Sequence, residues 1–137
     1  LEKAIHLSAL DQDLKRMSEG IETMVGEKGI ALSGGQKQRI SIARSLIRNP
    51  DILILDDALS AVDAKTEKRI IDGIRTNRTG KTTIIVTHRL SAIQHADLIV
   101  VLDDGRIIEM GTHDELSASD GWYSRQNDYY LKGGAST

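Results

Sequence analysis

The distribution of apolar residues along the chain predicts two short buried strands. Residues 51–56 form an almost wholly apolar run, and the segment Thr82–Thr87 is β-branched almost throughout. Such runs are typical of central strands in a parallel sheet. Between them, Asp63 can cap a helix that carries Ile70 and Ile74 on one face. The strand–helix–strand order indicates a parallel α/β sheet.

The spacing of apolar residues predicts helices in the region before the first strand. Ser33 can cap a helix whose apolar stripe runs from Ile40 to Ile47. Asn49-Pro50 ends this helix, because the residue before a proline disfavours helical backbone. Upstream, residues 2–18 indicate one or two amphipathic helices, and the glycines of Gly20–Ala31 predict a loop.

The last third of the chain predicts a hairpin followed by helix. Leu98–Leu102 and Arg106–Met110 flank Asp103-Asp104-Gly105, which is a turn signal. Thr112 with Glu115 three residues later forms a capping box for a final helical region.

Composition narrows the class of protein. The 137 residues suit one small domain, and 39% hydrophobic with 28% charged residues is ordinary for a globular protein. A net charge of −2 gives no reason to expect a nucleic-acid partner, and the absence of cysteine excludes disulfides and thiolate metal sites. No apolar run approaches the roughly 18–20 residues of a membrane span. Leu1 is not a start methionine, which suggests a piece of a longer protein.

The string Leu-Ser-Gly-Gly-Gln-Lys-Gln-Arg at 32–39 is a candidate phosphate contact. Gly34 and Gly35 let a ligand approach the backbone closely, and they stand where a helix start favours an anion. Ser33 adds a hydroxyl group. The alternative is an ordinary Ser/Gly helix start, which three residues alone would favour; the full string is far more specific.

Acidic and imidazole side chains follow the two predicted strands. Asp56 and Asp57 end the first strand, and His88 follows the second. Ligands of parallel sheets bind at this edge, where one carboxylate can hold Mg²⁺, the other can orient a water, and histidine can contact a phosphate. The alternatives are acids that cap a turn and a surface histidine.

Gly80-Lys81-Thr82 only imitates the end of a phosphate-binding P-loop. That motif needs a glycine where Arg75 stands, and it needs a helix where Thr82 begins a strand. A turn between helix and strand accounts for these residues.

Taken together, these motifs resemble the nucleotide-binding domain of ABC transporters of the exporter type, over about residues 1–130. The residues that carry the resemblance are Leu32–Arg39 for the signature motif, Ile52–Asp57 for Walker B, Ser60–Asp63 for the D-loop, His88 for the switch histidine, and the exporter-like segments Thr23–Gly29 and Asp97–Leu116. The resemblance implies a partial P-loop NTPase (RecA-like) parallel sheet with part of the ABC helical subdomain. It divides the chain into helical subdomain (1–50), ATPase core (51–111) and C-terminal helical region (112–137).

The resemblance also implies ATP and Mg²⁺ as cofactors and a role for each matching residue. Asp56 would hold the metal, and Asp57, His88 and Asp63 would act in catalysis. The residues expected to contact ATP held by a partner's P-loop are Leu32, Ser33, Gly34, Gly35 and Gln36.

Two departures from the family pattern shape the expected function. The upstream half with the Walker A P-loop and Q-loop is missing, so this fragment alone is expected to be inactive. Asp57 stands where most members have glutamate, which resembles the weakened-site half of heterodimeric multidrug exporters. The expected function is powering export at the cytoplasmic face of the cell membrane. Its expected partners are the exporter's transmembrane domain and a different nucleotide-binding subunit, paired head to tail.

Two other functions stay open at this point. A non-transport ABC ATPase would share the motifs, although the exporter-like loop at 23–29 argues against it. A non-catalytic regulatory module that completes a partner's ATP site is compatible with the missing P-loop and with Asp57. Because half a domain leaves apolar surface uncovered, the fragment is also expected to self-associate.

Overall fold

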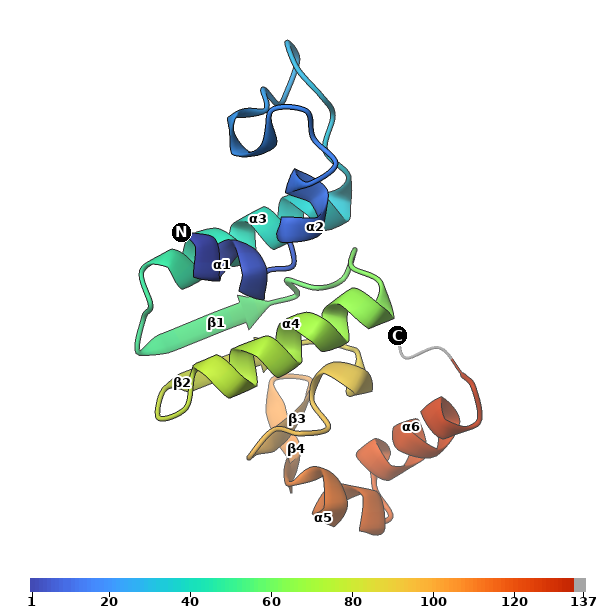
Figure 1. Cartoon of the computed structure of the whole chain (residues 1–137). Helices are drawn as coiled ribbons and strands as arrows, with labels where there is room; N and C mark the ends of the chain where they lie inside the picture. Colours follow the sequence, from blue (N-terminus) through green and yellow to red (C-terminus); the bar gives the residue numbers. More distant parts are fainter. Residues whose placement is uncertain (135–137) are drawn as a thin grey trace. The chain divides into compact units, whose positions relative to one another are not determined.

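The computed structural model describes residues 1–134 and forms two compact units, Leu1–Val86 and the residues from Thr87 onward (Figure 1). Each unit has its own core. The unit boundary reflects packing and does not test the division into 1–50, 51–111 and 112–137, which stays a prediction. Residues 135–137 lie outside the described residues.

The first unit contains the predicted helices and strands in the predicted order. They are α1 (Glu2–Leu7), α2 (Asp11–Leu14), the 3₁₀ turn η1 (Gly20–Glu22), α3 (Gly34–Ile47), β1 (Ile52–Asp56), α4 (Ala64–Asn77) and β2 (Thr82–Val86). Strands β1 and β2 pair in parallel, from Ile52 opposite Thr82 to Asp56 opposite Val86. The predicted parallel α/β architecture is therefore confirmed.

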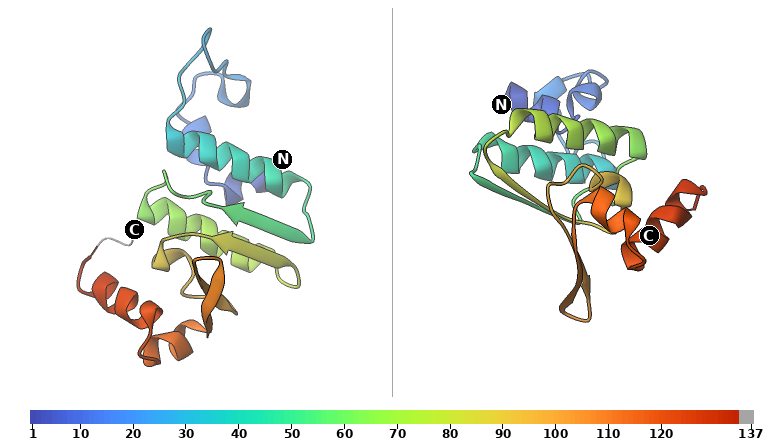
Figure 2. Two further views of the ribbon diagram at one scale, coloured as in Figure 1. Left: turned by 180° about the vertical axis from the view of Figure 1, so that it is seen from behind. Right: turned by 90° about the horizontal axis from the view of Figure 1, so that it is seen from below.

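One face of the parallel sheet carries the core of this unit. Leu53 and Leu55 of β1 point into it and are buried together with Ile42 of α3 and Ile70 of α4. Helices α3 and α4 lie on the same side of the two strands (Figure 2). This arrangement buries the apolar stripes that the helical spacing predicted.

The prediction that both strands are fully buried is wrong, because the other face of the sheet is exposed. Ile52 and Ile54 are each 60% exposed, and Ile84 and Val86 are exposed as well. Successive side chains of a strand point to opposite faces, so helices on one side protect only alternate residues. The continuous apolar run thus marks a face that is uncovered within residues 1–134.

Side-chain caps fix where the two long helices begin. Ser33 accepts a hydrogen bond from the Gln36 N–H, and Gln36 Oε1 accepts one from the Ser33 N–H, which completes a capping box. Asp63 caps α4 by accepting from the Thr66 N–H at 3.0 Å. Both caps agree with the sequence prediction.

The second unit begins with the 3₁₀ turn η2 (Leu90–Ala92) and continues with a hairpin of β3 (Ile99–Asp103) and β4 (Arg106–Gly111). Asp104 and Gly105 have φ of 46° and 72°, which suits a tight hairpin turn. Helices α5 (His113–Ala118) and α6 (Trp122–Leu131) follow, the first with the predicted Thr112 capping box. Within the described residues, no helix is long and apolar enough to span a membrane.

Candidate nucleotide site

The start of helix α3 presents backbone donors and a hydroxyl group to an anion. The capping box uses the N–H groups of Ser33 and Gln36. The first backbone bond of the helix is donated by Lys37 to the Ser33 carbonyl, so no helical carbonyl reaches the N–H groups of Gly34 and Gly35. The Ser33 oxygen accepts the cap bond, and its hydroxyl hydrogen can still donate to a ligand. These groups fit a phosphate.

Glycine is needed at position 35 for the close approach of Ala61 as well as for the approach of a ligand. A Cβ at this position would lie 2.8 Å from the Ala61 carbonyl oxygen, whereas one at Gly34 would lie 3.4 Å from the Ala61 Cβ. The segment 57–61 therefore packs directly on the helix start. Only glycine permits this approach at position 35.

Gln38 connects helix α3 to the same segment by three hydrogen bonds. Its Nε2 donates to Ser60 Oγ at 2.8 Å and to the Asp57 carbonyl at 3.3 Å. Its Oε1 accepts from the Ala61 N–H at 2.8 Å. One side chain of the signature string thus fixes the loop that follows β1.

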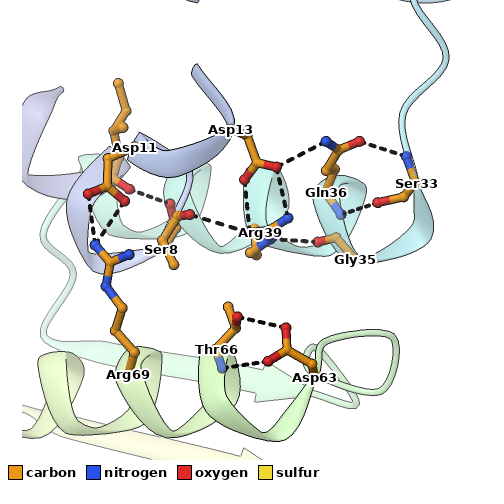
Figure 3. Close-up of polar contacts among 12 residues, drawn as sticks. Ser8, Asp11, Asp13, Ser33, Gly35, Gln36, Arg39, Asp63, Thr66 and Arg69 are labelled. Carbon is orange, nitrogen blue, oxygen red and sulfur yellow. Dashed lines mark hydrogen bonds and ion pairs between the residues drawn. The ribbon is translucent and has the colours of Figure 1, made fainter. Parts of the chain in front are cut away.

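A second polar cluster joins the helix start to α2 (Figure 3). Asp13 of α2 accepts from Gln36 Nε2 at 3.0 Å. Arg39 Nη1 lies 2.8 Å from Asp13 Oδ2, and Arg39 Nε donates to the Gly35 carbonyl. The predicted contacts Ser33, Gly35 and Gln36 are therefore joined into one network.

Asp56 and Asp57 lie at the carboxyl end of β1, as predicted, and both are exposed. The Asp57 N–H donates to the Val86 carbonyl at 2.9 Å, and its φ of 50° is left-handed. The chain therefore turns sharply directly after the strand, and the backbone at Asp57 no longer follows the direction of β1. Such non-glycine conformations often occur at functional sites.

Asp63 has a clear local role. Its side chain caps α4 and accepts from the Thr66 hydroxyl and N–H, and these hydrogen bonds lower the pKa of Asp63 below its usual value. The carboxylate is therefore ionised at neutral pH. Its predicted catalytic role stays a prediction beside this observed capping role.

His88 comes two residues after Val86 ends β2, and its side chain is exposed. It belongs to the second unit, and its predicted contact with a phosphate stays a prediction.

Lys81 belongs to the string Gly80-Lys81-Thr82, which only imitates a P-loop. It donates to the Asn49 carbonyl at 2.8 Å beside the turn at Gly80. This hydrogen bond has a structural role at the amino end of the sheet.

The residues present fit a Mg²⁺ ion that is shared with a nucleotide. Within residues 1–134, no group of three or more acidic or histidine side chains could hold a metal by itself. Mg²⁺ is usually held by one or two carboxylates together with waters and substrate phosphates. The exposed carboxylate of Asp56 suits such a role.

Sequence reasoning missed the residues that support the helix start. Asp13, Gln38 and Arg39 are polar side chains on predicted helices, where exposed positions are the ordinary expectation. Apart from Gly35, which accepts from Arg39 four residues later, their partners are 19 to 30 residues away in sequence, so no local pattern connects them. The only available signal was that Gln38 and Arg39 belong to the specific string at 32–39.

Comparison with known proteins agrees with this geometry. The family model described as ABC transporter matches residues 5–60. The chain is 65% identical, over 92% of its length, to the probable multidrug resistance ABC transporter ATP-binding/permease protein YheI of Bacillus subtilis. It is 47% identical, over 93% of its length, to the ATP-dependent lipid A-core flippase of Pseudomonas fluorescens. It covers 22% and 21% of these two proteins, so the chain spans about a fifth of their length.

A solved structure has the same fold. A bacterial Atm1-family ABC exporter with ATP bound superposes with a TM-score of 0.84 and 42% identity, over 96% of this chain and 23% of that one. Residues 5–60 therefore form part of an ABC transporter domain, and the chain is similar to ABC exporters over more than nine-tenths of its length.

Proposed function

We propose that the chain is a working part of an ABC exporter, where it completes an ATP site and helps to power transport across a membrane. The observation that carries this proposal is the start of α3, where the Gly34 and Gly35 N–H groups and the Ser33 hydroxyl remain available to a phosphate. The P-loop that holds this nucleotide would lie on a second nucleotide-binding domain that pairs head to tail with this one.

The carboxylate edge would serve a different ATP molecule from the one that α3 contacts. Asp56 would hold Mg²⁺ through water, which when bound neutralises phosphate charge. Asp57 would orient the attacking water, and His88 would contact the terminal phosphate. Aspartate is one methylene shorter than glutamate, roughly 1–1.5 Å, and a misplacement of about 1 Å can cost on the order of 100-fold in rate. We therefore assign Asp57 to the slower site of an asymmetric pair.

The partners follow from this assignment. A different nucleotide-binding subunit would pair head to tail with this chain and supply the P-loop that faces Ser33. A transmembrane domain would transmit the motion, and the chain would lie at the cytoplasmic face of the membrane. Without these partners, the exposed apolar residues Ile54 and Val86 would drive self-association of the fragment. Sedimentation of the isolated chain as a compact monomer would contradict that part of the proposal.

The test is ATP turnover and substrate export by an intact transporter that contains this chain, reconstituted in lipid vesicles. Ser33→Ala is expected to slow turnover about tenfold or more, because one preorganised donor to the reacting group is lost. Ser45→Ala is the matched control, since Ser45 lies on the same helix and donates only to the Ser41 carbonyl. Equal turnover in the wild type and in Ser33→Ala would reject the proposed role.

A non-catalytic module is the alternative function that Asp57 allows, although the similarity to exporter ATP-binding proteins does not favour it. A module of this kind would raise ATP affinity at the partner's P-loop without affecting turnover. Ser33→Ala would then weaken ATP binding and leave the maximal rate unchanged, which separates the two functions.

A further inference from the structure

The ion pair between Asp13 and Arg39 lies next to the signature string, yet Asp13 is outside every motif in the chain. Its carboxylate is only 13% exposed and the Arg39 side chain only 14%. Arg39 approaches with two nitrogens, Nη1 at 2.8 Å from Oδ2 and Nη2 at 3.3 Å from Oδ1. The Nη2 contact is a charge-assisted hydrogen bond, whereas Oδ2 accepts no hydrogen bond and is held by the positive charge of Arg39.

The same carboxylate decides how the Gln36 amide is oriented. Asp13 accepts hydrogen bonds, and it takes one from Gln36 Nε2 at 3.0 Å. The Ser33 N–H can only donate, and it reaches Gln36 Oε1 at 2.8 Å. Only one orientation of the amide satisfies both neighbours, so the acceptor at position 13 holds the capping box in a single arrangement.

The capping box in turn sets the direction of the Ser33 hydroxyl. Ser33 Oγ accepts from the Gln36 N–H, which leaves its hydroxyl hydrogen able to donate to a ligand. Arg39 also donates to the Ala9 carbonyl, and Ala9 is buried with a left-handed φ of 59°. The network therefore anchors the start of α3 to the turn between α1 and α2.

We infer that Asp13 is a positioning residue for the signature segment: through Gln36 and Arg39 it holds Ser33 and the Gly35 backbone in the arrangement that receives a phosphate. The inference rests on the proposed function, because it assigns Asp13 a role in ATP turnover. Asp13 itself does not touch the nucleotide in this account. It acts by keeping the donors at the helix start preorganised.

Asp11 provides a matched control two residues away. It lies on the same helix α2 and pairs with an arginine, Arg69 of α4, at 2.8 Å. Its side chain is 26% exposed, so it is also partly buried. Its partners belong to α1 and α4, not to the signature segment. Figure 3 shows both pairs.

The experiment measures ATP turnover and thermal unfolding of the intact transporter with Asp13→Asn or Asp11→Asn. Asp13→Asn is expected to lower kcat about tenfold, because the donors are misplaced, while Asp11→Asn stays within about twofold of wild type. Combining Asp13→Asn with Ser33→Ala is expected to slow turnover by much less than the product of the two single effects, because the Ser33 hydroxyl is one of the donors that Asp13 positions.

Further variants separate this inference from folding defects and from the proposed function. Asp13→Glu keeps the charge beside Arg39 and is expected to fold normally with an intermediate kcat. Wild-type kcat in both Asp13 variants, or multiplicative slowing in the double variant, would overturn the inference. If Ser33→Ala slows turnover and Asp13→Asn does not, only the positioning role fails. If Ser33→Ala has no effect, the proposed function fails first and the inference with it.

Discussion

The signature segment and the carboxylate edge of β1 both belong to the first unit, but they are built differently. Around Ser33 and Gly35, side chains from α2 and α3 fix each polar group through hydrogen bonds. Asp56 and Asp57 are exposed carboxylates at the end of a strand whose second face is uncovered. The helix start is thus preorganised by this chain, whereas the two carboxylates face solvent.

The largest expected effect tests the carboxylate edge. Asp57→Glu in the intact transporter should raise ATP turnover, by up to about 100-fold, because the longer side chain brings the carboxylate within reach of the attacking water. The readout is steady-state phosphate release. A rate that falls, as it would on altering an ordinary catalytic group, would show that Asp57 does not belong to a slower site.

The second prediction breaks the connection between the two regions. Gln38→Ala removes three hydrogen bonds to the segment 57–61 and should lower the free energy of unfolding by about 2–3 kcal/mol. Denaturant unfolding measures the change. Lys37→Ala, at an exposed position on the same turn of α3, serves as control and should shift stability by less than about 0.5 kcal/mol.

The third prediction compares neighbouring glycines. Gly35→Ala should cost about 1–3 kcal/mol of folding free energy, because its Cβ would press on the Ala61 carbonyl at 2.8 Å. Gly34→Ala should cost less, since its Cβ would meet the Ala61 side chain at 3.4 Å. If the two variants unfold alike, the close approach of the loop to α3 is wrong.

The smallest effect concerns pH and the anchoring of α2. Burial alone would raise the pKa of Asp11, but hydrogen bonds and charge from Arg69, together with His6, outweigh it and lower that pKa. A carboxyl whose folded-state pKa is lowered stabilises the fold above its unfolded value, about 3.9, and this stabilisation is lost as pH falls further. Asp11→Asn should therefore reduce the loss of stability as pH falls below about 4. An unchanged pH profile would contradict the pairing with Arg69.

Local patterns predicted much of the fold. Ser33, Asp63 and Thr112 were recognisable as caps because each precedes a helical apolar stripe or an acidic residue at capping-box spacing, and all three cap helices in the structure. The parallel pairing of β1 with β2 followed from the intervening helix. The exposed face at Ile52 and Ile54 was not predictable, because an apolar run does not reveal whether one or two layers cover it.

The candidate site was predictable only in part. The string at 32–39 is specific enough to identify its own residues, but hydrogen bonds from Asp13 and Gln38 join positions far apart in sequence. Such contacts depend on how helices pack, which single-residue patterns do not encode. The residues that hold the start of α3 were therefore missed, and the residues proposed to touch the nucleotide stay a prediction.

The most direct test of the central claim is ATP binding to a P-loop-bearing cassette, measured by titration with and without this chain. If Ser33 and the Gly34 and Gly35 N–H groups complete that cassette's site, wild-type chain should lower the Kd for ATP at least about tenfold, or 1.4 kcal/mol. The Ser33→Ala chain should lower it much less. Equal ATP affinity with and without the wild-type chain would contradict the account.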